Sequence, residues 1–248
     1  MKFALLASGS AGNCCVIKHN DSSIVIDCGS TKKYLMECFG RMEYDPASAD
    51  AILITHTHSD HVAQMKTFEH IPTYATQEIK TKNLKNIEPF DEFDIQDFHI
   101  TVLPLSHDCE GTVGYIIEAE GEKMVYVTDT GYVKDEVKQR IVNADYYIFE
   151  SNHDIEMLMQ TNRPVYLKQR IIGDTGHLCN EDCANIITDA MGENTKEIIL
   201  AHISREGNTR DLALEALEKQ LAKKKIDAEN IVRYPAEQFG MYVGGNKK

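Results

Sequence analysis

Short apolar runs, separated by polar turns, organise the first half of this chain. Runs of this length with polar residues at both ends are typical of β-strands rather than of helices. The turns between neighbouring runs fall at Gly12-Asn13, Asn20-Asp21 and Glu120-Gly121. The pattern predicts strands over residues 2–7, 14–18, 23–27, 51–55, 98–103, 113–119, 123–128, 145–150 and 198–201.

Longer segments, most of them in the second half, are typical of helices. We expect Ser30 or Thr31 to cap the first of them and Gly40 to end it. Helices are predicted over residues 31–39, 76–84, 154–160, 165–172, 180–191 and 209–222. Hairpins followed by alternating helices and strands predict two sheets flanked by helices, an α/β (α+β) architecture. We expect one domain over residues 1–243 and a frayed tail over residues 244–248.

Metal-ligand residues are concentrated in one loop. The segment His56-Thr57-His58-Ser59-Asp60-His61 directly follows the predicted strand at residues 51–55. Two histidines spaced by two on extended backbone point the same way. Asp60 and His61 follow where the chain would turn into a helix, so they can face a second point. One catalytic ion takes three protein ligands and an open position for water. A solvated polar loop is the alternative reading of this segment.

Further residues of ligand type stand where other predicted strands end. They are Asp27, His107, Asp129 and His202. Two ions that together clamp a displacement need more donors than one loop holds, and these residues can supply them. We therefore expect two divalent metal ions.

The assignment of these residues to two ions is a hypothesis. One ion would be held by His56, His58 and His107, and the second by Asp60, His61 and His202. Asp129 would bridge the ions, because a carboxylate can give one oxygen to each. A hydroxide shared between the ions would be the nucleophile. Asp27 would accept an imidazole N–H from a ligand and fix that ring.

The ordered set of motifs resembles the metallo-β-lactamase superfamily. Asp27, the His56–His61 segment, His107, Asp129 and His202 match its motifs in order, and the match runs from about residue 1 to 235. A closer likeness is to the YycJ/WalJ (VicX) group, bacterial relatives of RNase Z and RNase J. It rests on the segments 8–14, 150–154 and 176–180, with Cys179 where the group usually has Ser. The resemblance implies an αββα four-layer sandwich, two ions of Zn²⁺ or Mn²⁺ with Fe as a further option, and a nuclease or phosphodiesterase. By likeness to RNase Z, Asp60 could also orient the hydroxide or accept its proton. The activity commonly assigned to the group is 5′-to-3′ exonuclease activity on double-stranded DNA.

His177 is the main candidate outside the ligand set. It precedes a predicted helix, and helix N-termini favour phosphate. It could bind the substrate phosphate or, as the resemblance to RNase Z suggests, protonate the leaving oxygen; a histidine that only packs the loop is the alternative. His153 could be a further ligand, a substrate contact or a supporting donor. Ser204, Arg205 and Asn208 follow His202 and could contact phosphate.

Composition changes this picture in two ways. A formal net charge of −13 is unusual for a nucleic-acid-binding protein, so binding would need a local basic patch. Candidates for that patch are Lys134, Lys138, Arg140, Arg163, Lys168, Arg170 and Arg205. Seven cysteines without a regular framework favour free thiols in a reducing cytoplasm, and no apolar run is long enough for a membrane span.

Three classes of function therefore remain at the level of sequence. The first is a dinuclear metal nuclease whose partner is nucleic acid, DNA rather than RNA. The second is a hydrolase of a small phosphodiester, ester or thioester, which the acidic composition favours. The third is a metal-binding regulator, against which the full ligand set argues. A nuclease needs an open, basic approach to the ions, whereas a small-molecule enzyme needs an enclosed pocket.

Overall fold

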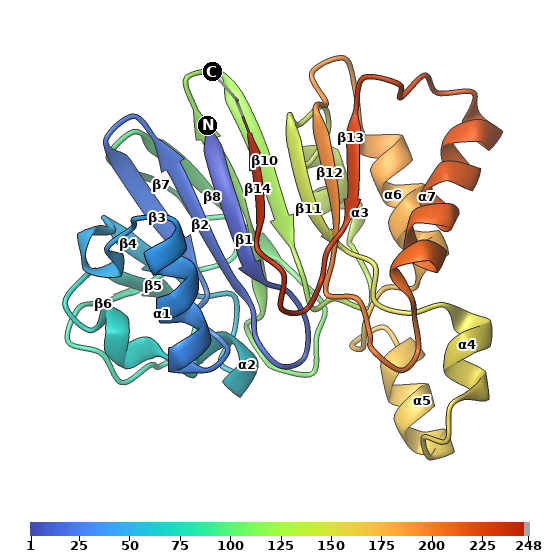
Figure 1. The fold of residues 1–248 in the computed structure, drawn as a ribbon, viewed down its shortest axis with the longest axis horizontal. Coiled ribbons are helices and arrows are strands. Elements are labelled where there is room, and N and C mark those ends of the chain that lie inside the picture. Colours follow the sequence, from blue (N-terminus) through green and yellow to red (C-terminus); the bar gives the residue numbers. More distant parts are fainter. Residues whose placement is uncertain (246–248) are drawn as a thin grey trace.

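The computed structural model describes residues 1–245. Within them, two seven-stranded β-sheets pack face to face and helices cover their outer sides, which gives four layers (Figure 1). The first sheet has the order β14 (Tyr242–Gly245), β1 (Lys2–Ala7), β2 (Cys14–His19), β3 (Ser22–Ile26), β4 (Ala51–Leu53), β5 (Thr73–Ala75) and β6 (Leu84–Asn86). The second has the order β13 (Val232–Pro235), β12 (Glu197–Ala201), β11 (Tyr146–Glu150), β10 (Glu122–Val127), β9 (Val113–Ala119), β8 (Phe98–Pro104) and β7 (Glu92–Ile95). The predicted αββα sandwich is confirmed.

The helices lie mainly on the two outer faces, with one pair set apart. They are α1 (Lys32–Arg41), α2 (Ser59–Val62), α3 (Asp135–Arg140), α4 (Ile155–Gln160), α5 (Val165–Ile172), α6 (Asn180–Ala190) and α7 (Arg210–Lys224), with 3-10 turns η1 (Pro46–Ser48) and η2 (Met65–Phe68). In Figure 1, α1 covers the first sheet and α6 and α7 cover the second. Helices α4 and α5 extend beyond the sheets at the lower right.

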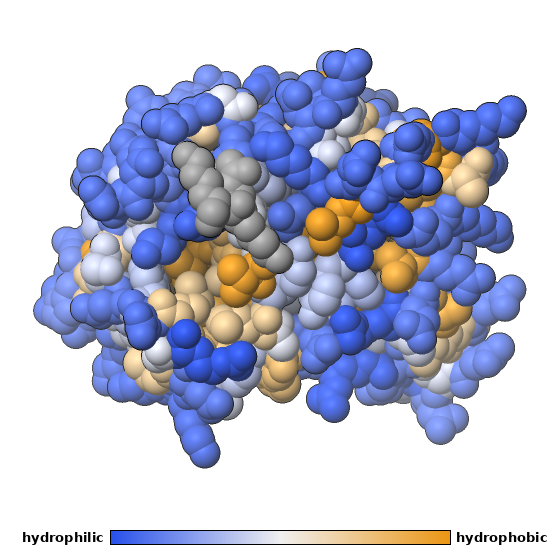
Figure 2. Space-filling model, turned by 45° about the horizontal axis from the view of Figure 1, so that its top comes forward, coloured by the Kyte–Doolittle hydropathy of each residue, from blue (hydrophilic) through white to orange (hydrophobic). Residues whose placement is uncertain are grey.

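Three apolar clusters hold the layers together. The central one fills the space between the sheets and includes the buried rings of Tyr115 and Tyr126. The second joins the second sheet to α6 and α7 through Ile187 and Leu217, and the third joins the first sheet to α1 through Phe39. Because each sheet has apolar residues on both faces, both faces must be covered. The face shown in Figure 2 is largely hydrophilic, with its apolar side chains in small separate groups.

Strand direction brings several strand ends to one edge of the sandwich. Strands β3, β4, β5 and β6 are parallel to one another, and so are β10, β11, β12 and β13. Strand β8 is antiparallel to β9, which is antiparallel to β10, so β8 and β10 end at the same edge. In open sheets of this kind, ligands bind at the carboxyl ends of the strands. The residues that follow these strands include every ligand-type residue predicted from the sequence.

Most predicted elements are found within a few residues of their expected bounds. Thr31 caps α1, since its hydroxyl accepts a hydrogen bond from the N–H of Tyr34, but the helix runs past Gly40 to Arg41. Glu120 and Gly121 both have positive φ, as a tight hairpin turn requires. Strands β5, β6, β7, β13 and β14 and helix α3 were not predicted, because they are short and carry weak patterns.

Two predictions were wrong. Residues 76–84 form no helix, because the backbone around Asn83 and Leu84 pairs with β5 instead. Strand pairing overrides a segment with no strong apolar stripe. Gly244 and Gly245 are not frayed, since they pair with Phe3 and Lys2 of β1. The remainder of the expected tail, residues 246–248, lies outside the described residues.

Candidate metal centre

Three histidines form the first group at the shared strand edge. His56 and His58 come from the loop after β4, and His107 comes from the loop after β8. Their ligand nitrogens lie within 4.8 Å of one another. The His56 ring is buried, whereas the His58 side chain is 40% exposed. This group therefore has one side open to solvent.

A second group adjoins it, with Asp129 between the two. Asp60, His61 and His202 form one set of ligand atoms within 4.8 Å, and His56, His61 and Asp129 form another. Asp129 presents Oδ2 to His61 Nε2 at 3.2 Å and Oδ1 to His202 Nε2 at 3.4 Å. The structure thus brings together all seven residues that the sequence predicted as ligands.

The donor atoms of this cluster fit divalent metal ions. Among the described residues, His56 Nε2, His202 Nε2 and Asp129 Oδ2 are buried and lack a hydrogen-bond partner. Buried polar atoms are normally paired, so unpaired ones that converge need another explanation. Imidazole nitrogen and carboxylate oxygen suit zinc, manganese and iron. The cluster is a metal-binding site by its chemistry.

Protonation in the cluster follows from burial and from the nearby carboxylates. Burial and, to a smaller extent, the adjacent His61 lower the pKa of His56 to about 2. Burial opposes charge on His202 as well, but Asp129 and Glu150 raise its pKa to about 9. Against the effect of burial, His202 and His61 hold the pKa of Asp129 well below its usual range. Asp129 is therefore a carboxylate ready to accept a cation.

Asp27 supports the ring of His61. Its Oδ2 lies 2.7 Å from His61 Nδ1, and it also accepts the hydroxyl of Thr55 at 2.8 Å. Its other oxygen accepts the backbone N–H of Thr55 at 2.9 Å. Because Asp27 holds Nδ1, His61 directs Nε2 toward Asp129. This is the geometry of a carboxylate that orients a metal-binding histidine.

Glu150 plays the equivalent part for His202, and sequence reasoning did not single it out. Its Oε1 lies 2.9 Å from His202 Nδ1 and 2.8 Å from His177 Nδ1. Its Oε2 accepts the backbone N–H of Thr130 at 2.8 Å. Despite burial, His177 and His202 hold the pKa of Glu150 at about 2. Glu150 is the last residue of β11, and the rule that singled out Asp129 and His202 at strand ends applies equally to it.

His177 lies at the open side of the cluster. Its side chain is 22% exposed, and its ring centroid lies 5.2 Å from that of His107 and 5.3 Å from that of His202. Since Nδ1 is hydrogen-bonded to Glu150, Nε2 is the ring nitrogen that is free to contact a substrate. His177 lies before the first turn of α6, which Cys179 caps.

The remaining predicted residues are placed differently from one another. His153 is buried, forms a β-bridge with Cys179, and has a pKa that burial lowers to about 4. Asn208 is buried and donates to the carbonyls of Ser151 and Asn152, so it supports the loops and does not face a substrate.

Ser204 and Arg205 lie at the surface end of this loop. Ser204 is half-buried, its N–H donates to the carbonyl of Asn152, and its hydroxyl accepts from Gly207. Arg205 is exposed. Both remain candidates for substrate contact.

The Gly-rich turn after β1 also belongs to this site, which the sequence alone presented as a simple hairpin. Asn13 Nδ2 lies 2.9 Å from His61 Nε2, and the Asn13 N–H donates to the carbonyl of Asp60. Ser8 accepts the backbone N–H of His202 at 2.8 Å. The turn therefore links the first sheet to ligands from both sheets.

The backbone is strained where ligands leave the strands. Asp27, Asp129 and His202 have φ of 57°, 60° and 53°, which non-glycine residues adopt rarely. Such positions cluster at functional sites, because the surrounding structure must hold them there. The same edge thus combines strain, buried charge and converging ligands.

The fold and this site together define a metal-dependent hydrolase of the metallo-β-lactamase fold. The chain belongs to the β-lactamase superfamily, since residues 23–203 match the Beta-lactamase superfamily domain. It is similar to "Exodeoxyribonuclease YycJ" of Bacillus anthracis, with 34% identity over 240 residues that cover 90% of each chain. It is also 33% identical over 246 residues to "Exodeoxyribonuclease WalJ" of Streptococcus pneumoniae, covering 91% of this chain and 90% of that one.

Solved structures give the same fold. The metallo-beta-lactamase fold protein YhfI of Bacillus subtilis aligns with a TM-score of 0.71 and 18% identity, over 98% of this chain and 99% of that one. The family resemblance drawn from the sequence is confirmed. Within residues 1–245, no helix is long and apolar enough to cross a membrane.

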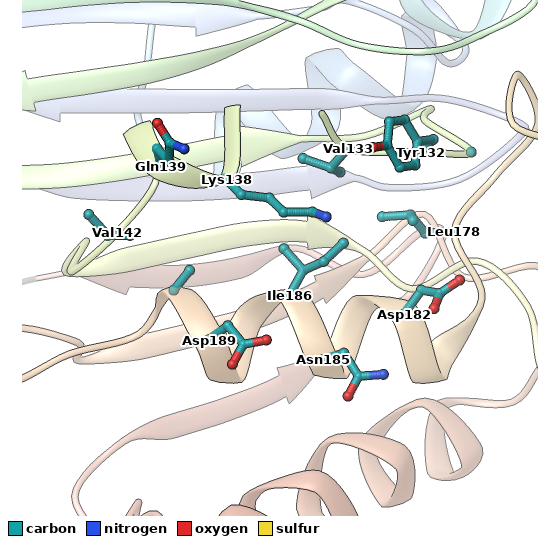
Figure 3. A pocket seen from close by; sticks show the side chains of 12 residues that line it. Tyr132, Val133, Lys138, Gln139, Val142, Leu178, Asp182, Asn185, Ile186 and Asp189 are labelled. Atoms are coloured by element: carbon teal, nitrogen blue, oxygen red, sulfur yellow. The ribbon is translucent and has the colours of Figure 1, made fainter. Parts of the chain in front are cut away.

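A separate hollow of about 450 Å³ lies between α3 and α6 (Figure 3). Its lining includes Val133, Leu178 and Ile186, with Lys138 directed into it and Asp182 at one end. It shares no lining residue with the seven predicted ligands. Gly131 and Leu178 also line it, and they stand two residues after Asp129 and one residue after His177.

Proposed function

We propose that this protein is a dinuclear metal-dependent phosphodiesterase that degrades double-stranded DNA as a 5′-to-3′ exonuclease. The observation that carries the proposal is the convergence of two ligand groups around Asp129 at an edge open to solvent at His58 and His177. An open edge admits a polymer, whereas an enclosed pocket suits a small substrate. Both similar proteins named above are called exodeoxyribonucleases, which supports DNA as the substrate.

In this proposal, three residues would hold each ion, and Asp129 lies between the two groups. His56, His58 and His107 would hold one ion, and Asp60, His61 and His202 the other. Two bound divalent ions would supply positive charge for a phosphodiester and lower the pKa of a water molecule. Zinc, manganese and iron all suit five imidazoles and two carboxylates. Asp27 and Glu150 keep His61 and His202 in the tautomer that offers Nε2.

Two further residues would move protons. The Asp60 side chain is 21% exposed and its Oδ2 lies 3.6 Å from His61 Nε2, so it can accept a proton at the cluster. His177 is bonded to Glu150 through Nδ1 and can donate from Nε2 to the leaving oxygen or to a phosphate oxygen. Their places on the cluster support this division, with Asp60 as base and His177 as acid.

A small-molecule phosphodiesterase is the second candidate. The observation that favours it is the net charge of −13, which opposes general attraction to a phosphate backbone. Digestion of 5′-labelled duplex DNA, duplex RNA and bis-p-nitrophenyl phosphate, with Mn²⁺ or Zn²⁺ added, separates the two. DNA degradation that Asp129→Ala and His58→Ala abolish would support the nuclease. Turnover of the small diester with DNA left intact would refute it and favour the second candidate.

We also propose a cytoplasmic location. All seven cysteines are free, and six of them are buried. Free thiols persist in reducing compartments, where disulfides are rare. Nucleic acid, DNA rather than RNA, is the partner we propose.

A further inference from the structure

Helix α5 is anchored beside the histidines and carries exposed side chains away from them. Arg170, near its end, contacts the carboxylate of Asp108 through Nε at 2.5 Å and through Nη2. The other oxygen of Asp108 lies 3.3 Å from His107 Nε2 and 3.9 Å from His58 Nε2. One carboxylate therefore separates this guanidinium from the first ligand group.

We propose that α5 guides the substrate strand into the metal centre, with Arg170 binding a backbone phosphate and Tyr166 stacking on a base further out. The inference rests on the proposed nuclease function and adds the surface that selects a polymer. It also gives a protein with a net charge of −13 a local contact for phosphate.

Arg170 differs from Lys168 and Arg140 in its exposure and position. Lys168 is buried and donates to the carbonyls of Met159 and Thr161, so its ammonium group already has partners at the end of α4. Arg140 pairs with Glu92, and its carbonyl accepts from Lys123 near the start of β10, at the edge opposite Asp129.

The Arg170 side chain is 61% exposed, so part of its fork faces solvent. A guanidinium has five N–H donors, and the contact with Asp108 uses only Nε and Nη2. It can therefore hold Asp108 and a phosphate at once.

The end of α5 is held tightly against the metal centre. The His177 N–H donates to the carbonyl of Ile171 at 2.9 Å, and His107 Nδ1 lies 3.1 Å from the carbonyl of Gly176. A Cβ on Gly176 would lie 2.2 Å from the carbonyl oxygen of Ile171. Because no side chain fits there, α5 ends in direct contact with the loop that carries His177. Its direction relative to the histidines is fixed by packing.

Tyr166 is placed to meet a base of the same strand. It stands four residues before Arg170, so both lie on one face of α5, about 6 Å apart along the axis. Tyr166 is 72% exposed and Val165 is 68% exposed, although such side chains are normally covered. Bases in a stacked strand rise about 3.4 Å each, so 6 Å spans about two nucleotides. Aromatic rings stack on unpaired bases without regard to sequence, so this contact would form where the end of the duplex has opened.

The test compares DNA with a substrate too small to reach Arg170 and Tyr166 of α5. Arg170→Gln and Tyr166→Leu are assayed for kcat and KM on 5′-labelled duplex DNA and on bis-p-nitrophenyl phosphate. We expect each to lower kcat/KM for DNA about tenfold more than for the small diester. Arg170→Gln should also reduce the slope of log DNA affinity against log salt concentration by about 1. The affinity is measured by fluorescence anisotropy in an Asp129→Ala background.

Two controls separate a specific contact from a general loss. Tyr166→Phe keeps the aromatic ring, so this variant should retain most of the DNA activity that Tyr166→Leu loses. Arg140→Gln removes one exposed guanidinium at the opposite edge and should leave both substrates unaffected.

The outcomes distinguish this inference from the proposed function. If the wild type cleaves DNA and Arg170→Gln, Tyr166→Leu and Arg140→Gln cleave it with the same kcat/KM, the inference is overturned and the nuclease function stands. Equal losses on DNA and on the small diester also overturn it, since Arg170 would then act through Asp108 on the metal centre. A wild-type protein that hydrolyses only the small diester overturns the nuclease function and this inference together.

Discussion

Replacing Glu150 by Gln tests how the second ligand group is held in place. The carboxylate accepts from His202 and His177 through one oxygen and from the Thr130 N–H through the other. Glutamine has the same shape but only one acceptor oxygen. If that oxygen faces the histidines, the buried Thr130 N–H meets an NH₂ group and loses its acceptor. If the amide turns over, both histidines lose theirs.

The magnitude follows from these contacts. A buried donor without an acceptor costs about 1–3 kcal/mol, and hydrogen bonds to charged groups contribute about 1.5–3 kcal/mol. Removing such a supporting contact to a metal-binding histidine typically costs about 10–100-fold in metal affinity or activity. We therefore expect Glu150→Gln to weaken one of two zinc-binding events by about 10–100-fold, or about 1.4–2.7 kcal/mol.

The assay is competition for zinc between the protein and a chromogenic chelator, resolved into two binding events. Glu122→Gln is the matched control, because Lys196 and the amino terminus also hold the pKa of Glu122 at about 2 despite burial. Glu122 begins β10, at the end opposite Asp129, so its loss should lower stability and leave both zinc affinities unchanged. Two zinc affinities in Glu150→Gln within twofold of the wild type would refute the reasoning.

The other predictions concern acid stability, backbone space and metal removal. Burial lowers the pKa of His153 to about 4 from 6.5, so the unfolded chain binds a proton there that the folded chain does not. The resulting stability is fully present above pH 6.5 and is lost as the pH falls through 4, which amounts to about 3 kcal/mol. Urea unfolding over this pH range should therefore show a larger loss of unfolding free energy in the wild type than in His153→Gln. Gly29→Ala puts a Cβ 1.5 Å from the Asp60 carbonyl oxygen and should lower both the melting temperature and zinc binding. Chelation of zinc from protein loaded at 1,000 times its dissociation constant should remove about 4 kcal/mol of stability, seen by calorimetry.

Each of these has an outcome that contradicts it. Parallel pH profiles for the wild type and His153→Gln would mean that this histidine titrates alike in the folded and unfolded chains. Gly40→Ala is the control for Gly29→Ala, since nothing lies within 4 Å of its Cβ and the change should stabilise α1 by up to about 1 kcal/mol. Equal losses in the two glycine variants, or a melting temperature that chelation leaves unchanged, would contradict the respective arguments.

The sequence by itself determined the fold class and the residues that converge at the metal centre. Apolar runs with polar turns define strands locally, and the spacing within His56–His61 is a local property of the backbone. Residues at the ends of strands that run the same way must meet at one edge. For that reason His107, Asp129 and His202 could be grouped with this segment, although they lie far apart in the chain.

Only the tertiary structure decided which residues support those ligands and which backbone segments pair. Glu150 is bonded to His202, and Ser8 accepts the N–H of a residue 194 positions away. Residues 76–84 lost their predicted helix to pairing with β5, and Gly244 and Gly245 became a strand on β1. Periodicity and turn chemistry act over a few residues, whereas these contacts depend on how two sheets pack, so no local pattern carries them.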